Sequence, residues 1–385
     1  MNERVVIAGG GPVGLAFAKD ISTDKRLTIA VVEKTVPSRA PLMGPLDHRV
    51  FALSLGTQKF LARIGVWQHL PAARIEPIRA MQIFGDRADS RLDFNARQPL
   101  AYVVEHQALI AAIWHALEGV ENVISHIGQE PVSCSASGQR RTLVTRSGLE
   151  LNADLLVGAD GPHSWIRQQA GITSRVKDYE SFGVVANFDC EVAHAGVAYQ
   201  WFKDDSILAY LPLPGRCISM VWSVTQHEGD RLCQLTPEEL SLQVAAAGRH
   251  VLGRLSASSP AVKFPLRRAM AETWIQPGLA LIGDAAHSVH PLAGQGANLG
   301  FADACALAKT LRERSRFSLP GDYAVLRRYE RSRQEQVWAM ATMGHELRRL
   351  FQHPSAVAGW ARNQGLKLLN RQSVVKKMMM DYARA

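Results

Sequence analysis

The chain has 385 residues, and its 47% hydrophobic and 21% charged content is ordinary for a soluble globular protein of one large or two medium domains. Five scattered cysteines without a CxxC pair exclude a disulfide or zinc framework, and no apolar stretch approaches the about 20 residues needed to span a bilayer. The net charge of +9 resides in the last fifth of the chain, where residues 312–385 hold 15 Lys and Arg against 6 Asp and Glu.

The N-terminal segment predicts a β-α-β unit. A short apolar strand leads into the loop Gly9-x-Gly11-x-x-Gly14, a helix follows, and a second strand ends at Glu33. Such a loop lets a pyrophosphate approach the backbone at a helix N-terminus, and an acid at this spacing accepts hydrogen bonds from ribose hydroxyls. We therefore expect a bound dinucleotide, FAD or NAD rather than NADP. The segment is not a signal peptide, so we expect the protein to keep its N-terminus and to stay in the cytoplasm.

The next elements follow from periodicity. We expect a helix with a loop before it at 47–65, a helix at 104–117, a hairpin at 143–151 and a buried strand at 155–157.

The middle of the chain changes character. Alternating, β-rich runs separated by turn signals predict an antiparallel sheet with one face covered, inserted into the first domain, with strands at 183–190, 197–202, 207–213 and 217–224. Residues 78–94 are expected to add strands to this sheet. After residue 302 the chain is expected to be helical, with a break at 319–322.

Two later segments each contain a buried strand that delivers an aspartate. In LLVGADGPHS, at 155–164, the plain interpretation of Asp160 is an Asx turn beside a Ser164 helix cap. In LALIGDAAHSVHPLAGQGAN, at 279–298, the strand ends at Asp284 and a glycine-rich loop opens a helix near Ala297. The positive end of that helix would stabilise negative charge on a reduced flavin.

Together the three segments resemble those of the class A flavoprotein aromatic hydroxylases, whose type is p-hydroxybenzoate hydroxylase. In that family the first loop and its acid bind the ADP part of FAD, the second motif serves both FAD and NAD(P)H, and the third aspartate holds the ribityl chain. The segment DHRVFALS at 47–54 carries the family arginine near the pyrophosphate. The resemblance implies these FAD-binding residues: Gly9, Gly11, Pro12, Val13, Gly14, Glu33, Lys34, Arg49, His106, Asp160, Gly161, Gly283, Asp284, Pro291, Gly294, Gly296, Ala297 and Asn298.

Within that family the chain is most similar to the ubiquinone-biosynthesis hydroxylases, along nearly its whole length. The similarity is carried by VVEH at 103–106, LPL at 211–213, HPLAGQG at 290–296 and RRYExxR at 327–333. With the elements above, it implies a mixed α/β and α+β protein of three parts: a Rossmann-like FAD-binding domain (1–77, 100–178 and 266–318), an antiparallel-sheet substrate domain (78–99 and 179–265) and a C-terminal helical region (319–385).

The implied activity is hydroxylation of the ring of a polyprenylated phenol or quinol in ubiquinone biosynthesis. In this class NAD(P)H binds transiently and reduces FAD, and O2 then gives a flavin C4a-hydroperoxide. The candidate pocket residues are Tyr199, Trp201, Tyr210, Arg216, Trp222, His290 and Pro291; for the five on the sheet the alternative is a packed structural role. His287 and His290 lack a third ligand at zinc-like spacing, so no metal is expected.

Other functions stay open on the sequence alone. The fold would also suit a hydroxylase of a non-quinone aromatic, a prenyl-chain reductase, or a flavin-bearing scaffold of a quinone-synthesis complex; a flavin halogenase would need a WxWxIP segment, which is absent. From residue 365 onward, apolar and basic residues recur at helical spacing. They predict either a terminal helix packed on its own domain or an interfacial helix against the inner membrane or a partner protein, and no nucleic-acid binding is expected.

Overall fold

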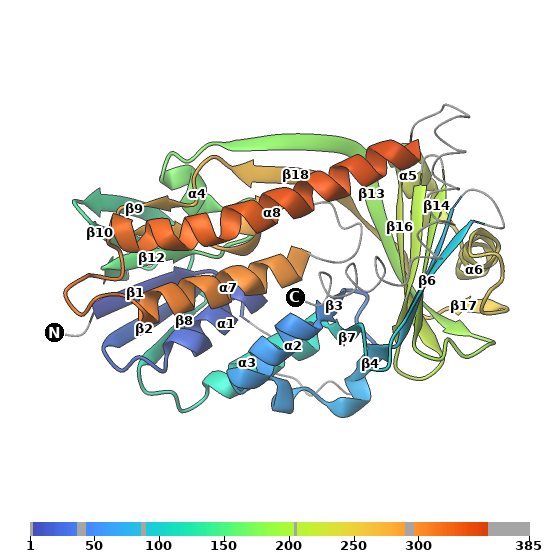
Figure 1. Cartoon of the computed structure of the whole chain (residues 1–385), viewed down its shortest axis with the longest axis horizontal. Helices are drawn as coiled ribbons and strands as arrows, with labels where there is room; N and C mark the ends of the chain where they lie inside the picture. The colour runs from blue at the N-terminus through green and yellow to red at the C-terminus, as the bar shows by residue number, and fades with distance from the viewer. Residues whose placement is uncertain (1–2, 37–43, 86–89, 204–205, 289–295, 353–385) are drawn as a thin grey trace.

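The computed structural model describes residues 3–36, 44–85, 90–203, 206–288 and 296–352. Figure 1 shows two lobes side by side, a parallel sheet with its helices in the first lobe and a large antiparallel sheet in the second. The residues His290, Pro291 and Gly294, and the basic segment after residue 352, lie outside the described part.

The first lobe is built on a six-stranded sheet. Its strands from β20 to β8 run parallel, and β19 runs antiparallel to β20. Residues 5–8 and 155–157 are almost fully buried, because both faces of a parallel sheet are covered by other elements and its strands therefore read as continuous apolar runs. The order across the sheet is β19 (Ile275–Gln276), β20 (Leu279–Leu281), β12 (Leu155–Gly158), β1 (Glu3–Ala8), β2 (Leu27–Glu33) and β8 (Val123–Ile127).

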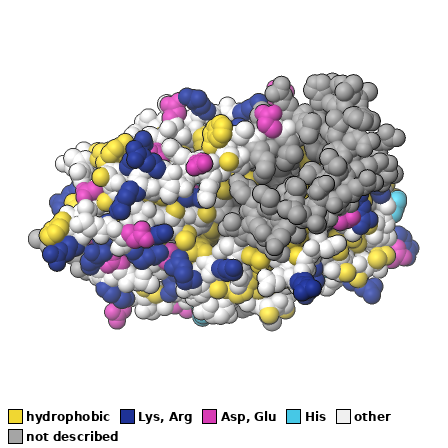
Figure 2. Space-filling view, viewed as in Figure 1, with side chains coloured by type: hydrophobic (Ala, Val, Ile, Leu, Met, Phe, Trp, Pro, Cys, Tyr) yellow, Lys and Arg dark blue, Asp and Glu magenta, His cyan; other side chains and the backbone are white. Residues whose placement is uncertain are grey.

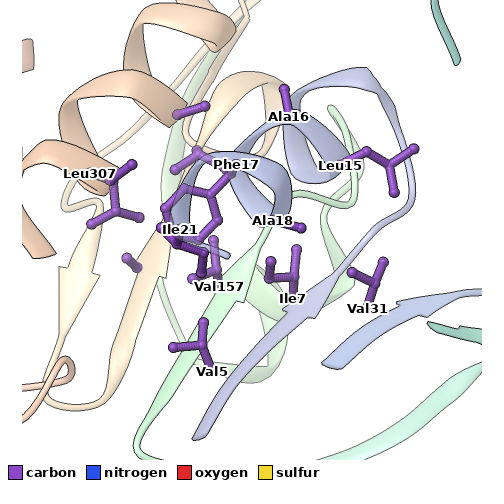
Figure 3. Close-up of a cluster of buried hydrophobic side chains, with 14 of the residues drawn as sticks. Val5, Ile7, Leu15, Ala16, Phe17, Ala18, Ile21, Val31, Val157 and Leu307 are labelled. Atoms are coloured by element: carbon purple, nitrogen blue, oxygen red, sulfur yellow. The ribbon is translucent and has the colours of Figure 1, made fainter. Parts of the chain in front are cut away.

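Helices pack on this sheet and on one another. Phe17 and Ile21 of the first helix lie in the same buried cluster as Val5, Ile7 and Val157 of the sheet (Figure 3). Burial of each such large apolar side chain contributes about 1.5–3 kcal/mol. The helices are α1 (Pro12–Ile21), α2 (Leu55–Arg63), α3 (His106–Leu117), α4 (Trp165–Gln169), α7 (Gly296–Arg312) and the long α8 (Tyr323–Gln352), which packs on α7.

Two three-stranded sheets accompany the first lobe. One has the order β3 (Val50–Ser54), β7 (Ala101–Glu105), β4 (Ile75–Ile78), and the other the order β11 (Glu150–Ala153), β10 (Arg140–Thr145), β9 (Pro131–Ser137). The hairpin predicted at 143–151 is confirmed by the pairing of β10 with β11. Two short 3-10 helices, η1 (Trp67–His69) and η2 (Ala72–Arg74), precede β4.

The helix expected over 47–65 is shorter than predicted. Phe51 and Leu53 belong to strand β3, where they lie opposite Val104 and Tyr102 of β7. The helix α2 begins only after Ser54, whose hydroxyl accepts a hydrogen bond from the Thr57 amide at 3.1 Å. Apolar spacing alone does not separate these two elements, because a strand followed directly by a helix changes period at the junction.

The second lobe confirms the predicted antiparallel sheet. The added strands from residues 78–94 are present, and within the described part of the chain β5 and β14 form the one parallel pair of this sheet. The order is β21 (His287–Ser288), β18 (Val262–Ala271), β13 (Ser174–Cys190), β16 (Cys217–Thr225), β15 (Ser206–Leu213), β14 (Val197–Lys203), β5 (Ala80–Phe84) and β6 (Arg91–Asn95), with β17 (Leu255–Ala257) paired to β13.

Two helices of the second lobe were not expected from the sequence. They are α5 (Gln226–Gln234) and α6 (Pro237–Ala247), and Figure 1 shows α6 on the side of the sheet away from the first lobe. A signal for α6 is present in the sequence. Thr236 and Glu239 form a capping box, with the side chain of each bonded to the backbone amide of the other, and Pro237 occupies the first helical position.

Long strands cross the predicted domain boundaries. The strand β13 runs through the boundary at 178/179, and β18 runs through the boundary at 265/266, so the exact division into domains stays a prediction. Among the described residues, no helix is long and apolar enough to cross a membrane. On the face shown in Figure 2, Lys and Arg side chains of the described part are interspersed with Asp and Glu.

Candidate functional site

The three motif strands lie next to one another in the parallel sheet. In the order β20, β12, β1, each strand ends at the same edge of the sheet, because all three are parallel. The glycine loop at 9–14 follows β1, the Asp160 loop follows β12, and the Asp284 turn follows β20. Segments separated by more than 100 residues in sequence are thereby assembled at one place, the carboxyl edge where open α/β sheets bind ligands.

The three glycines of the first loop have different surroundings. Gly9 has a φ of +116°, and a Cβ there would overlap the carbonyl oxygen of Ala159. A Cβ on Gly14 would overlap the carbonyl oxygen of Gly9, so Gly14 permits close packing of α1 on the loop. A Cβ on Gly11 would meet no atom within 4 Å. Backbone atoms therefore pack closely against Gly9 and Gly14, whereas the space in front of Gly11 is open. This arrangement fits the approach of a pyrophosphate to the N-terminus of α1.

Glu33 lies beside this loop. Its carboxylate accepts hydrogen bonds from the Gly10 amide at 2.5 Å and from the Thr35 amide at 2.7 Å. The half-buried carboxylate keeps lone pairs for ribose hydroxyls. The ammonium of Lys34 is directed elsewhere, because it lies 2.6 Å from the carboxylate of Glu130 in an exposed ion pair.

Val13 connects the first motif to the third. Gly283 has a φ of +60°, and a Cβ on it would lie 3.4 Å from Val13 Cγ1. A Cβ on Gly300 of α7 would lie 2.7 Å from Val13 Cγ2. The missing side chains of these two glycines thus allow the start of α1, the Asp284 turn and the start of α7 to pack together at one point. Pro12, the first residue of α1, adds a fixed backbone angle at the same place.

Asp284 is presented at this junction. Its side chain is exposed, while the neighbouring residues of the turn are buried. Desolvation by the surrounding protein raises the pKa of Asp284, against the opposing effect of His287 and Arg49 and with a small addition from Asp303. The carboxylate is thus accessible to a ligand, enclosed by protein, and within electrostatic reach of Arg49.

Arg49 directly precedes strand β3, and His106 begins helix α3 directly after the neighbouring strand β7. The guanidinium of Arg49 lies 5.7 Å from the ring centre of Phe51, and that ring lies 5.6 Å from the imidazole of His106. Burial and the nearby Arg49 charge lower the pKa of His106 to about 4, although Asp47 acts in the opposite direction. His106 is therefore neutral at physiological pH, while the exposed side chain of Arg49 places a positive charge beside it.

Ser164 caps helix α4, as its plain interpretation predicted, by accepting a hydrogen bond from the Arg167 amide at 3.0 Å, and the carboxylate of Asp160 contacts the same helix start. It accepts hydrogen bonds from the Ser164 hydroxyl at 2.5 Å and the Ile166 amide at 3.0 Å. Gly161, with a φ of +83°, faces open space. The sequence interpretation missed Arg167, which is buried and donates to the carbonyl oxygens of Pro162 at 3.0 Å and Ala285 at 2.7 Å. Arg167 therefore joins the second motif to the third.

The side chain of Asn298 has a structural role. Its carbonyl oxygen accepts hydrogen bonds from the Ser54 amide at 2.9 Å and the Thr57 hydroxyl at 2.8 Å, and its amide donates to the Ala52 carbonyl at 2.9 Å. These bonds attach β3 and α2 to the first turn of α7. The backbone amides of Gly296 and Ala297, at the N-terminus of α7, remain the groups of this segment suited to stabilise an anion.

Four aromatic residues expected in the substrate pocket lie in the core instead. Tyr199, Trp201, Tyr210 and Trp222 all face α5 and α6 in one buried cluster. The hydroxyl of Tyr210 donates to the carbonyl oxygen of Val244 at 2.5 Å, and burial raises the pKa of this phenol. This corrects the prediction from sequence. A strand sends alternate side chains to opposite faces, and the face that carries these four aromatics packs on helices.

The opposite face of the same sheet is directed toward the first lobe. Ala198 and Leu213 lie in one buried cluster with Ala52 of β3 and Val103 of β7, and Leu211 packs against that cluster. Arg216 belongs to neither face. It is exposed in the turn after β15, with its guanidinium 3.4 Å from the carbonyl oxygen of Glu191. The expectation that Arg216 lies on the sheet is thus also corrected.

The chain is similar to known proteins along nearly its whole length. A family model described as FAD binding domain matches residues 2–343. The 3-demethoxyubiquinol 3-hydroxylase of Escherichia coli is 31% identical over 391 residues, which cover 99% of this chain and 98% of that protein. The ubiquinone hydroxylase UbiL of Rhodospirillum rubrum is 30% identical, with 98% of this chain and 89% of that protein covered.

Solved structures agree with the fold. The p-nitrophenol 4-monooxygenase PnpA of Pseudomonas putida has a TM-score of 0.79 at 16% identity, covering 100% of this chain and 98% of that one. HpxO of Klebsiella pneumoniae, in complex with FAD and uric acid, has a TM-score of 0.75 at 17% identity, covering 99% of this chain and 96% of that one. With the glycine loop, the acid after β2 and the Asp284 turn assembled at one sheet edge, the chain belongs to the FAD-dependent monooxygenases, in the family of the ubiquinone-biosynthesis hydroxylases.

Proposed function

We propose that this FAD-dependent monooxygenase hydroxylates the aromatic ring of a prenylated phenol or quinol in ubiquinone biosynthesis. The observation that carries the proposal is the end-to-end match to the 3-demethoxyubiquinol 3-hydroxylase, 98% of whose length is covered. The match includes both lobes. It therefore supports a shared substrate class better than a match of the nucleotide-binding strands alone would, because specificity resides in the site and not in the fold.

The first lobe would hold FAD through groups of distinct chemistry. The amides at the start of α1 would bind the pyrophosphate across Gly11, Glu33 would accept from the ribose, and Asp284 would accept from the hydroxyls of the ribityl chain. Arg49 would neutralise phosphate charge, and the N-terminus of α7 would face the ring system. Bound FAD supplies the redox chemistry that activates O2, and the chain supplies position and polarity.

The second lobe would supply the substrate surface. The face of the sheet directed toward the first lobe also carries Val262 and Phe264 of β18, which lie opposite Val185 and Gly183 of β13. Their side chains are 40% and 39% exposed. An apolar surface of this kind suits a prenyl tail, whose burial is favourable in proportion to its apolar area.

NAD(P)H would visit the protein transiently. The sequence contains one GxGxxG loop, which is assigned above to FAD. The Gly161 segment, adjacent to that loop and open to solvent, is the candidate contact for the nicotinamide cofactor. We expect NAD(P)H oxidation to depend on it, whereas the Asp160 carboxylate serves the cap of α4.

The activity is tested with a panel of phenols that differ in prenyl length. Purified protein receives FAD, NADH or NADPH, and 18O2, and products are analysed by mass spectrometry. We expect substrate-stimulated NAD(P)H oxidation and one labelled oxygen on the ring, with the fragment pattern identifying the carbon. Loss of a double bond in the tail would indicate a reductase. Bound FAD with no substrate-stimulated oxidation for any member of the panel would indicate a scaffold.

The lipid solubility of the proposed substrate predicts where in the cell the protein works. We propose that the protein works in the cytoplasm at the surface of the inner membrane, where a prenylated phenol partitions into lipid. The basic C-terminal segment, outside the described residues, is the candidate contact with anionic lipid or with a quinone-biosynthesis complex. Truncation after Gly365 should lower cosedimentation with anionic liposomes and leave FAD bound. Unchanged cosedimentation would favour a terminal helix packed on its own domain.

A further inference from the structure

A buried carboxylate lies directly behind the Asp284 turn. Asp303 of α7 is fully buried, and its Oδ2 accepts a hydrogen bond from the Gly283 amide at 3.0 Å. The same oxygen lies 2.6 Å from Nε2 of His287. Its other oxygen, Oδ1, accepts from Nε of Arg333 at 2.8 Å. One side chain thus contacts the residues on both sides of Asp284 in the chain.

Arg333 holds this carboxylate from helix α8. Its guanidinium is almost completely buried, and it also donates to the Leu299 carbonyl in the first turn of α7 at 3.3 Å. Complete burial works to raise the pKa of Asp303, but the charges and hydrogen bonds of His287 and Arg333 hold it below its usual value. Asp303 is therefore an ionised group at neutral pH, enclosed in protein and matched by a cation.

Other bonds fix the remaining backbone of the turn. The hydroxyl of Tyr329 donates to the Leu281 carbonyl at 2.8 Å, and Arg167 donates to the Ala285 carbonyl at 2.7 Å. Hydrogen bonds thus reach the start of the turn from α8, its centre from α7 and its end from α4. Asp284 is the exposed residue within it.

Stability alone is a weak reason for such an arrangement. A buried ion pair can often be replaced by apolar residues of similar volume without loss of stability, since desolvation offsets most of the attraction. What apolar residues cannot do is bind a backbone amide and an imidazole at fixed positions. The geometry is that of outer groups that orient a ligand-binding residue.

We propose that Asp303, held by Arg333, is a positioning residue for FAD: through the Gly283 amide and His287 it fixes the turn that presents Asp284 to the cofactor. The inference deepens the role proposed above for Asp284. Neither Asp303 nor Arg333 was among the residues predicted from sequence to bind the cofactor, although Arg333 ends the RRYExxR run at 327–333.

The chain provides a matched control. Asp20, at the far end of α1, is 1% exposed and is bound by Arg63 at 2.8 and 2.9 Å and by Arg312 at 2.7 Å. Asp303→Asn and Asp20→Asn both take a buried carboxylate away from its arginine partners, the buried Arg333 in one case and the more exposed Arg63 and Arg312 in the other. Both variants should therefore lose stability, and only Asp303→Asn should affect the cofactor.

The experiment measures FAD affinity without turnover. Each apoprotein is titrated with FAD, flavin fluorescence quenching gives Kd, and urea unfolding of the apoprotein gives stability. We expect FAD affinity to fall about tenfold or more in Asp303→Asn, corresponding to roughly 1.4 kcal/mol, and to stay within about twofold in Asp20→Asn. The visible flavin spectrum of Asp303→Asn should also shift. Equal effects on Kd in the two variants, or none in either, would overturn the proposal.

Two further variants separate the possible failures. Arg333→Lys keeps the charge and should retain more FAD affinity than Arg333→Gln; if Asp303→Asn does not fold, this ordering decides the proposal. Asp284→Asn tests the ribityl assignment independently. If Asp284→Asn binds FAD normally while Asp303→Asn does not, the assignment of Asp284 fails, and the proposal that Asp303 acts by presenting Asp284 fails with it. The reverse pattern overturns the role of Asp303.

Discussion

Gly11 and Gly14 belong to one loop and have opposite surroundings. A Cβ on Gly14 would overlap backbone, whereas a Cβ on Gly11 would occupy space that no protein atom fills. Gly11 has a φ of −71°, which any residue adopts, so the backbone alone does not explain a glycine there. The open space in front of Gly11 leaves room for the pyrophosphate proposed to bind there.

Alanine substitution should separate these two roles. Gly14→Ala should destabilise the apoprotein by about 1–3 kcal/mol, because it forces a clash in a packed region. Gly11→Ala should leave apoprotein unfolding unchanged within about 0.5 kcal/mol and yet weaken FAD binding, since its methyl group occupies the pyrophosphate path. Urea unfolding and FAD titration measure the two effects. Wild-type FAD affinity in Gly11→Ala would contradict the assignment of this loop.

The neutral imidazole of His106 predicts a pH dependence. In the unfolded chain a histidine titrates near its usual pKa of about 6.5, whereas burial and Arg49 lower the folded-state pKa to about 4. Between these values the unfolded state binds more protons, so stability is full above about pH 6.5 and falls as pH drops toward 4. The urea-unfolding free energy of the wild-type apoprotein should fall more steeply over this range than that of His106→Gln. Parallel pH profiles of the unfolding free energy for the two proteins would contradict the lowered pKa of His106.

At the scale of elements, the sequence was most informative where local rules act alone. The β-α-β unit and the alternating strands were predicted correctly, because periodicity and glycine spacing are local. The sequence does not indicate which face of the antiparallel sheet meets the first lobe, so the candidate pocket residues include Tyr199, Trp201, Tyr210 and Trp222, which pack on helices instead. Each face is apolar in places, so only tertiary packing distinguishes them. Asp303 was missed for a related reason, since its donors come from distant elements.

The packing of α1 on α7 predicts a compensating pair of mutations. Gly300→Ala places a methyl group against Val13, where its Cβ would lie 2.7 Å from Cγ2, and should cost about 1–3 kcal/mol. Val13→Ala removes the clashing methyl groups, so the double variant should regain much of this loss. Unfolding free energies of the wild type, both single variants and the double variant form the cycle. Simple additivity of the two single effects would show that the cost of Gly300→Ala does not come from its contact with Val13.

At the scale of the whole molecule, one asparagine joins the lobes. The amide of Asn187, on the second-lobe strand β13, donates to the carbonyl oxygens of Leu46 and Asp47 at 3.1 Å each. This segment leads two residues later to Arg49. From its other side it is held by Glu105, whose carboxylate accepts from the Asp47 amide at 2.7 Å. The position of Arg49 therefore depends on both lobes.

Replacement of Asn187 by leucine should affect stability and cofactor together. Asn187→Leu keeps the volume and removes both donors, so we expect a loss of about 1–3 kcal/mol and weaker FAD binding. Asn152→Leu is the control, because Asn152 is exposed on the β11 strand, away from the junction of the lobes, and should change stability by about 0.5 kcal/mol or less. Denaturant unfolding measures the change in stability of both variants, and FAD titration measures the change in their FAD affinity. Unchanged FAD affinity in Asn187→Leu would show that the two lobes act independently on the site.

The adjacency of β1, β12 and β20 also has a consequence in time. These strands begin at residues 3, 155 and 279, and the helix that supplies Arg333 comes later still. A ribosome that adds about 5–20 residues per second needs on the order of 15–60 s between the first strand and that helix. A nascent chain that already contains the glycine loop and strand β2 therefore still lacks the strands β12 and β20. We expect FAD to be captured only after translation is nearly finished, and ribosome-bound chains stalled before residue 279 to bind none.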